Sequence, residues 1–370
     1  MILLGNVVLQ FFSIVLGVAI VFITVRSALQ TFVLPRSVQD ALTRQIFRYS
    51  RRVFDLYARL RRLNSYGARD RLMAFYAPLT LLLTPIVLLI YILIGYMFIY
   101  WGMGIDLGEA FRLSGSSMLT LGFVNNIEYA FEVIIFSEAI VGLILVALLI
   151  AYLPTIYAAF AKREAAVTML EVRAGSPPSA VEMILRHHRL ERLDKLSEVW
   201  VQWETWFVEL EESHTSLVAL VFYRSPVGRR SWVTAAGAVL DAAALTASML
   251  DIPQDMQTHI TLRAGYLSLR HIADFFNVEY LPEPRSDDPI SIQRTEFDEV
   301  YDQFVSLGVP VKPNREQAWR DFAGWRVNYD AVLLALAALT QAPYAPWSSD
   351  RSFIRVRSRL GNQRRLPNQR

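Results

Sequence analysis

The sequence of 370 residues contains no cysteine. Disulfide bonds, thiolate nucleophiles and cysteine-ligated zinc or iron–sulfur centres are therefore excluded. The sequence also lacks a G-x-G-x-x-G segment after a strand, a phosphate-binding loop and a calcium-binding loop, so no nucleotide-binding or calcium-sensing domain is indicated. The adjacent His187 and His188 point to different faces of a helix, which does not favour a metal site. We expect no enzymatic activity and no cofactor.

Long apolar runs are confined to the first 160 residues, although hydrophobic residues make up 54% of the chain. Two runs without a charge cover Ile2 to Val25 and Ala77 to Trp101, and a third, Val133 to Tyr157, contains only Glu138. A bilayer core ~30 Å thick needs about 20 such residues as a helix. The first run lacks the basic start and the small-residue cleavage site of a signal peptide. We therefore predict three transmembrane helices, at 1–25, 77–101 and 133–157.

Acidic residues are scarce between the first two spans. Residues 26–76 hold 11 arginines and three aspartates, whereas 102–132 hold one arginine and four acidic residues. Cationic loops stay in the cytoplasm. We therefore expect a multi-pass protein of the cell (inner) membrane, with its N-terminus outside and everything after Tyr157 in the cytoplasm.

The basic segment 26–76 is either a solvated linker or an amphipathic helix on the inner leaflet. Its apolar residues interleave with the arginines: Phe47, Val53, Phe54, Tyr57 and Leu60. We favour the helix, with anionic lipid as its partner. The tail 351–370 has seven arginines and no acidic residue. We expect it to be disordered and solvated, with anionic lipid as the alternative partner, and we expect no nucleic-acid binding.

A segment too short to cross a membrane lies between the second and third spans. Leu107 to Leu119 is long enough for a short helix, and Thr120-Leu121-Gly122-Phe123 follows it. Extended backbone after such a half-span can replace the hydration shell of a cation with carbonyl oxygens. A glycine lets the backbone turn its carbonyl inward, and the negative end of the short helix dipole favours a cation.

This order of span, short helix, Thr-Leu-Gly-Phe and span resembles the two-transmembrane ion-channel domain of the potassium-channel superfamily. SEAIVGLILVALLIAYL at 137–153 resembles the inner helix of bacterial channels of this family. The resemblance covers 77–157 and implies a pore helix and filter at 107–124 between an outer helix at 77–101 and an inner helix at 133–157. It implies a filter that binds permeant K⁺, and Na⁺ if selectivity is weak, formed by Thr120, Leu121, Gly122, Phe123 and Val124. Each chain has one such hairpin, so the resemblance implies a homotetramer.

The filter sequence departs from the family pattern at its outer end. Val124 stands where the family has a glycine, and Asn125 where an aspartate is usual. A β-branched residue is poorly suited to the left-handed backbone that a glycine adopts. Leu119 also stands where many potassium channels have a second threonine. We therefore expect a remodelled outer ion site and weak selectivity.

The third span contains two candidate supporting residues. Glu138 is either buried behind the filter, hydrogen-bonded to the pore-helix residues Ser116 or Ser117, or it faces the conduction pathway and attracts cations. Gly142 is the expected flexible point of the inner helix. The alternative for the whole region is a three-helix membrane anchor with an ordinary external hairpin.

Residues 158–350 have the pattern of a soluble all-α cytoplasmic domain with an unknown ligand or partner. The helix of the third span is expected to continue through 161–173. Turn signals then separate helices at 180–189, 192–213, 232–250, 254–276, 293–307 and 315–341. The apolar parts 233–250 and 331–341 are too short or too interrupted to span a membrane. Trp200, Trp203 and Trp206 form a stripe that we interpret as core.

The sequence thus predicts an all-α membrane protein that is a tetrameric, potassium-channel-like cation channel. The alternative is a non-conducting membrane scaffold or sensor. It would use the pore fold to tetramerise while its cytoplasmic domain binds partners.

Overall fold

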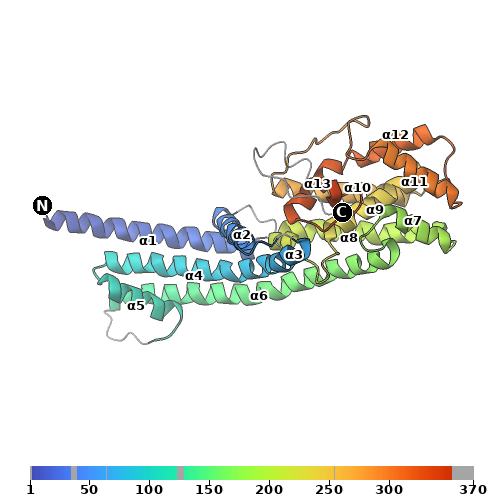
Figure 1. The fold of residues 1–370 in the computed structure, drawn as a ribbon. Helices are drawn as coiled ribbons and strands as arrows, with labels where there is room; N and C mark the ends of the chain where they lie inside the picture. The colour runs from blue at the N-terminus through green and yellow to red at the C-terminus, as the bar shows by residue number, and fades with distance from the viewer. Residues whose placement is uncertain (1, 35–39, 64, 123–128, 254, 352–370) are drawn as a thin grey trace. The chain divides into compact units, whose positions relative to one another are not determined.

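The computed structural model describes residues 2–34, 40–63, 65–122, 129–253 and 255–351. Within these ranges the chain is helical, apart from loops and one isolated antiparallel bridge between Leu250 and Val311 (Figure 1). Three helical stretches are long and apolar enough to cross a membrane: Val7–Phe32, Tyr66–Gly102 and Phe131–Ala174. An all-α protein with three candidate membrane helices, the pattern of a multi-pass membrane protein, is therefore confirmed.

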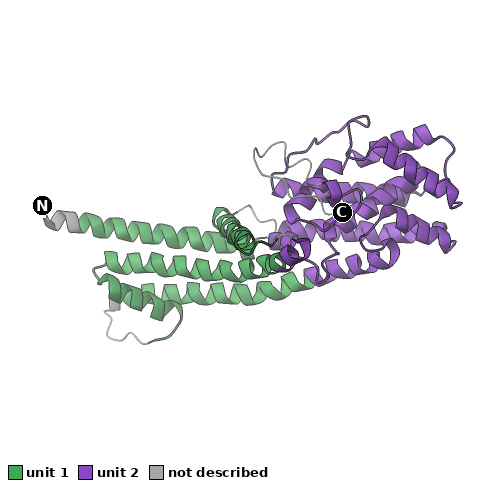
Figure 2. Ribbon diagram, viewed as in Figure 1, with its two compact units in different colours: residues 1–63, 72–158 green, residues 64–71, 159–370 purple. Residues whose placement is uncertain are grey.

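The chain divides into two compact units (Figure 2). Unit 1 comprises residues 1–63 and 72–158, and unit 2 comprises residues 64–71 and 159–370. The chain passes into unit 2 just before α3 (Tyr66–Ala74), returns to unit 1 within α3, and passes into unit 2 again within α6 (Tyr129–Ala174). Unit 2 therefore contains a short segment from the basic region that precedes the second span, which the sequence did not indicate.

Unit 1 consists of long apolar helices and two shorter ones. They are α1 (Ile2–Phe32), α2 (Ala41–Leu60), α4 (Tyr76–Gly102), α5 (Leu107–Met118) and the first part of α6 (Tyr129–Ala174). Gly17 of α1 and Gly95 of α4 let these two helices approach closely. A Cβ atom on Gly17 would clash with the carbonyl oxygen of Gly95. Ser13 also donates a hydrogen bond to the carbonyl oxygen of Phe98 at 2.7 Å.

The membrane helices extend beyond the apolar runs that predicted them. α1 continues to Phe32 rather than ending at Val25, and α6 continues without a break to Ala174. Pro154 lies inside α6, as prolines do in membrane helices when other groups satisfy the freed backbone. The expected extension of the third span through 161–173 is confirmed.

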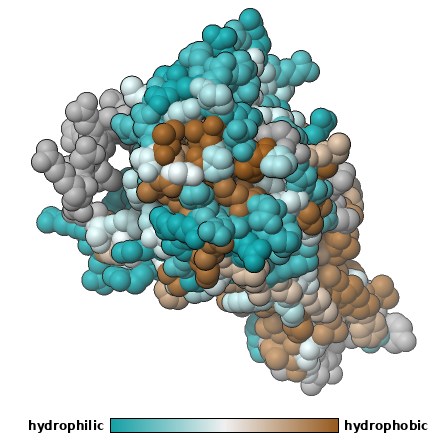
Figure 3. Space-filling model, turned by 90° about the vertical axis from the view of Figure 1, so that its right-hand side faces the viewer, coloured by the Kyte–Doolittle hydropathy of each residue, from teal (hydrophilic) through white to brown (hydrophobic). Residues whose placement is uncertain are grey.

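Unit 2 is a helical domain built around α9 (Trp232–Ser248), in which every residue is buried. Around it lie α7 (Ala180–Arg189), α8 (Leu196–Ser216), α10 (Met256–Phe275), α11 (Arg294–Ser306), α12 (Arg315–Arg326) and α13 (Asp330–Thr340), together with the 3₁₀-helices η1 (Leu193–Lys195) and η2 (Val218–Phe222) and the start of α3 (Tyr66–Ala74). The small side chains of α9 let it serve as a core helix. Figure 3 shows mostly hydrophilic side chains in the upper part of the view, with apolar side chains near its centre and at its lower right.

Most helices of unit 2 match the sequence predictions within a few residues. Ser179 caps α7 by accepting a hydrogen bond from the backbone N–H of Glu182, and the tryptophan stripe of α8 is buried core. The single helix predicted at 315–341 is wrong, because α12 and α13 are separate helices. At the break, the carbonyl oxygen of Asn328 accepts a hydrogen bond from Nε of Arg270 at 2.9 Å.

Candidate functional site

The half-span of unit 1 is α5, which has 12 residues. At 1.5 Å per residue it is ~18 Å long, too short to cross a bilayer core. Asp106 caps its N-terminus by accepting a hydrogen bond from the N–H of Gly108, and Glu109 lies in its first turn. Both acidic side chains interact favourably with the positive, N-terminal end of the helix dipole. The negative, C-terminal end of α5 lies next to Thr120.

The chain leaves α5 through a left-handed cap at Thr120. The N–H of Thr120 donates to the carbonyl of Ser117 at 3.0 Å, and the N–H of Leu121 donates to that of Ser116 at 2.8 Å. This is the hydrogen-bond pattern of a Schellman motif, whose left-handed position is usually glycine. Thr120 has φ 53° there. A β-branched residue in this conformation is strained, by about 1–2 kcal/mol.

Gly122 also has a left-handed backbone, with φ 67°. Thr120 and Gly122 therefore both depart from the extended conformation that we expected after the short helix. The side chains of Thr120 and Leu121 are exposed. Phe123 and Val124, the outer two predicted filter residues, lie outside the described residues, as does Asn125.

Glu138 of α6 is the buried acidic centre of this hairpin, with none of its surface exposed. Oε2 accepts a hydrogen bond from the hydroxyl of Tyr100 on α4 at 2.9 Å, and Oε1 accepts one from the hydroxyl of Ser114 on α5. Ser114 also contacts the carbonyl oxygen of Leu93 at 3.1 Å. One carboxylate thus links α4, α5 and α6, which reduces the cost of burying it at membrane depth.

The serines of α5 include one predicted partner of Glu138 and one that the sequence did not indicate. Ser116 and Ser117 are both buried, and the hydroxyl of Ser117 donates to the carbonyl oxygen of Ile135 at 2.8 Å. Ser117 is also a side-chain hydrogen-bond partner of Glu138, as expected, and Ser114 is a further donor to the same carboxylate. Sequence reasoning missed Ser114 and Tyr100. The available signal was the spacing of Ser114 and Ser117, which places both on one face of α5.

Gly142 lies within unbroken helix, directly against the end of α5. A Cβ atom at this position would come 2.5 Å from the carbonyl oxygen of Met118. The missing side chain therefore permits close packing of α6 on α5, two residues before Thr120. This contact gives Gly142 a packing role, and the hinge stays a prediction.

Unit 2 has a buried ion network around Arg326. The guanidinium of Arg326 is fully buried and pairs with Asp241 and with Asp330, while the hydroxyl of Tyr329 donates to Asp241 at 2.8 Å. Burial alone lowers the pKa of Arg326, but the two carboxylates outweigh it and hold that pKa above its ordinary value. These contacts join α12 and α13 to α9.

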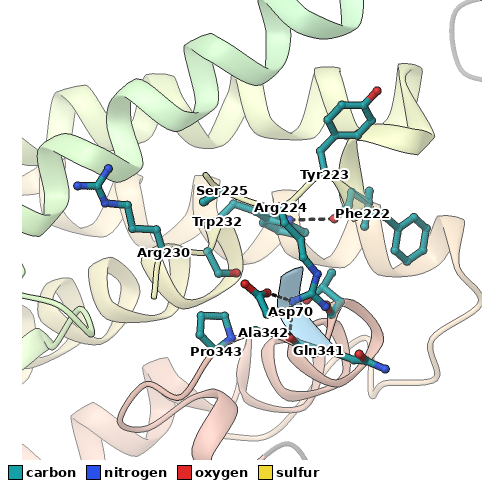
Figure 4. Close-up of a pocket in the computed structure, with 13 residues that line it drawn as sticks. Asp70, Phe222, Tyr223, Arg224, Ser225, Arg230, Trp232, Gln341, Ala342 and Pro343 are labelled. Carbon is teal, nitrogen blue, oxygen red and sulfur yellow. Dashed lines mark hydrogen bonds and ion pairs between the residues drawn. The ribbon is translucent and has the colours of Figure 1, made fainter. Parts of the chain in front are cut away.

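Arg224, which is half-buried, joins the start of α3 to the rest of unit 2 (Figure 4). Its guanidinium forms an ion pair with Asp70 and donates to the carbonyl oxygen of Thr340 at 2.9 Å. The space beside it is only about 20 Å³, which is room for about one water molecule. Arg224 therefore acts as an anchor for α3, and this space cannot hold an organic substrate.

Within the described part of the chain, no cluster of three or more histidine, aspartate or glutamate side chains could hold a metal ion. No family model, curated protein or solved structure matches this chain. The function must therefore be argued from the hairpin of α4, α5 and α6.

Proposed function

We propose that the protein is a tetrameric, potassium-channel-like cation channel that conducts ions passively through Thr120, Leu121 and Gly122. The observation that carries the proposal is the half-span α5, set between two candidate membrane helices and ending in strained backbone. Phe123 and Val124 complete the proposed filter. The permeant ions are K⁺ and, because Val124 replaces a glycine, Na⁺ as well.

The backbone at the end of α5 supports this proposal. Strained residues persist only where surrounding structure holds them, and they cluster at functional sites. Thr120 is such a residue, next to the negative end of the α5 dipole. Its hydroxyl and the adjacent carbonyl groups are ligands suited to a dehydrated cation. We infer that the described conformation rearranges when four copies place these groups around one axis.

Apolar side chains near the proposed filter support assembly. Phe111, Leu119 and Leu121 are each more than half exposed, at 54%, 53% and 59%. These side chains lie on α5 and immediately after it, where a fourfold assembly would cover them with neighbouring copies. The charge distribution of the loops supports an external filter and a cytoplasmic unit 2, which we propose regulates the pore.

The proposal is tested by cation flux in liposomes that contain the purified full-length protein. We expect uptake of K⁺ and Na⁺ that Thr120→Ala and Gly122→Ala abolish. Mass measurement of the solubilised complex should give four copies. A folded tetramer without flux, over a range of pH and membrane tension, would support the non-conducting scaffold instead.

A further inference from the structure

An open groove of about 360 Å³ lies between α2 and α4 in unit 1. Its apolar walls include Leu42, Ile46 and Val53 from α2 and Leu79, Leu83 and Val87 from α4. A volume of this size, lined mainly by apolar side chains, is typical of a binding site for an organic ligand.

The α4 wall of the groove has the length of one leaflet. Leu79, Leu83, Val87 and Tyr91 recur every four residues and line the groove along one side of the helix. From Leu79 to Tyr91 the helix rises by 12 steps, or ~18 Å at 1.5 Å per residue. One leaflet accounts for about half of the ~30 Å hydrocarbon core. The wall is therefore long enough to accompany an acyl chain through a single leaflet.

Thr80 supplies a polar group at one end of this wall. Its side chain is 1% exposed, and Oγ1 has no hydrogen-bond partner among the residues that the structure describes. A buried hydroxyl without a partner is unfavourable. Because Thr80 also lines the groove, a ligand with a carbonyl oxygen at this level could accept its hydrogen bond.

Positive charge lies beside the same groove. α2 contains five arginines and one aspartate, and the guanidinium of Arg52 lies 5.4 Å from the ring centroid of Tyr49, which lines the groove. Arg48 precedes Arg52 by one turn and shares its side of α2. Neither forms an ion pair with another described residue. These two guanidinium groups are suited to a phosphate.

The exposed apolar side of α2 indicates where the ligand comes from. Val53, Tyr57 and Leu60 are exposed at 64%, 46% and 74%. They follow one another at helical spacing, as on a helix that lies in the plane of a membrane interface. The groove is therefore open to the bilayer itself.

We propose that this groove binds one acyl chain of an anionic phospholipid from the bilayer. The acyl chain lies along Leu83, Val87 and Tyr91, an ester carbonyl oxygen accepts the Thr80 hydrogen bond, and the phosphate contacts Arg52 and Arg48. The site does not depend on conduction, so it applies to a channel and to a scaffold.

The test uses the full-length protein, delipidated in detergent and incubated with phosphatidylglycerol and phosphatidylcholine that carry the same acyl chains. Retained lipid is counted by native mass spectrometry. We expect Leu83→Trp, which fills the groove, to lower retained phosphatidylglycerol about tenfold. Leu82→Trp is the matched control, because Leu82 is equally exposed, at 42% against 43% for Leu83, but does not line the groove. It should retain lipid like the wild type.

A second pair of variants tests the headgroup contact on the helix surface, where folding is not at risk. Arg52→Gln should reduce the preference for phosphatidylglycerol over phosphatidylcholine about fivefold, as expected for one lost arginine–lipid contact. Arg59→Gln, beyond the end of the groove, should leave the preference unchanged. Equal lipid loss in Leu82→Trp and Leu83→Trp would overturn the proposal, as would no loss in either or equal binding of both lipids by the wild type.

Discussion

The hydroxyl of Tyr100 donates a hydrogen bond to Oε2 of Glu138 at 2.9 Å, and this bond connects two candidate membrane helices. Ser114 of α5 donates to the other carboxylate oxygen. The half-span is therefore held from the side by the same carboxylate that joins α4 to α6. Glu138 therefore braces the hairpin that we propose as a pore.

The first prediction concerns this brace. Glu138→Leu should lower the free energy of unfolding by about 1–3 kcal/mol, because it leaves the buried Tyr100 hydroxyl without its acceptor. Tyr100→Phe should lower the free energy of unfolding by less than Glu138→Leu does. The double variant should cost less than the sum of the two single variants, because the two residues share one interaction. Thermal unfolding in detergent measures all three, and strict additivity would show that the two groups do not interact.

The second prediction concerns Gly142. Gly142→Ala should destabilise the protein by about 1–3 kcal/mol, because its Cβ meets a backbone oxygen that cannot rotate away. Gly67→Ala is the matched control, since a Cβ there meets nothing within 4 Å, and alanine is the better helix former by up to ~1 kcal/mol. If Gly142→Ala unfolds at the wild-type temperature and changes only channel gating, Gly142 is a hinge rather than a packing residue.

The third prediction concerns Arg326. Arg326→Met should destabilise unit 2 by about 3–5 kcal/mol, because it leaves Asp241 and Asp330 buried without their cation. Arg294→Met removes two partly exposed pairs, with Asp298 and Glu316, and should cost less than about 1 kcal/mol. Unfolding followed by near-ultraviolet circular dichroism of the full-length protein distinguishes the two. Equal effects would contradict a special role for the buried network.

The fourth prediction concerns pH. Burial lowers the pKa of His214 well below its ordinary value of 6.5, and the nearby Arg163 lowers it further. Below pH 6.5 the unfolded chain therefore binds a proton that the folded chain does not. The free energy of unfolding is consequently highest above pH 6.5 and falls as the pH drops below it. The loss approaches about 1.4 kcal/mol per pH unit.

His214→Gln provides the comparison for this pH effect. Between pH 7.5 and about 5.5, the free energy of unfolding of this variant should fall by ~1 kcal/mol less than that of the wild type. Parallel stability profiles for the two proteins would show that His214 titrates normally in the folded state.

The sequence predicted the features that depend on local pattern. Apolar length identified the three candidate membrane helices, and the cap at Ser179 set the start of α7 correctly. The same local reasoning failed at 327–329, because the break between α12 and α13 involves a hydrogen bond from Arg270 on a distant helix. A continuous helical pattern carries no signal for such a contact.

In the candidate site, too, local pattern predicted some features and tertiary packing determined the others. The short length of α5 and the burial of the tryptophan stripe follow from apolar pattern. The additional contact of Ser114 with Glu138 depends on how α5 is rotated against α6, which tertiary packing determines. Asp70 of α3 forms an ion pair with Arg224, 154 residues away in the sequence. Neither relationship has a local sequence signal.

The most direct test of the central claim is the reversal potential of currents from the reconstituted protein, with K⁺ on one side of a planar bilayer and Na⁺ on the other. We predict a cation current that prefers K⁺ weakly, is abolished by Gly122→Ala and is unchanged by Gly67→Ala. A tetramer that carries no current, or one whose current persists in Gly122→Ala, would contradict the account.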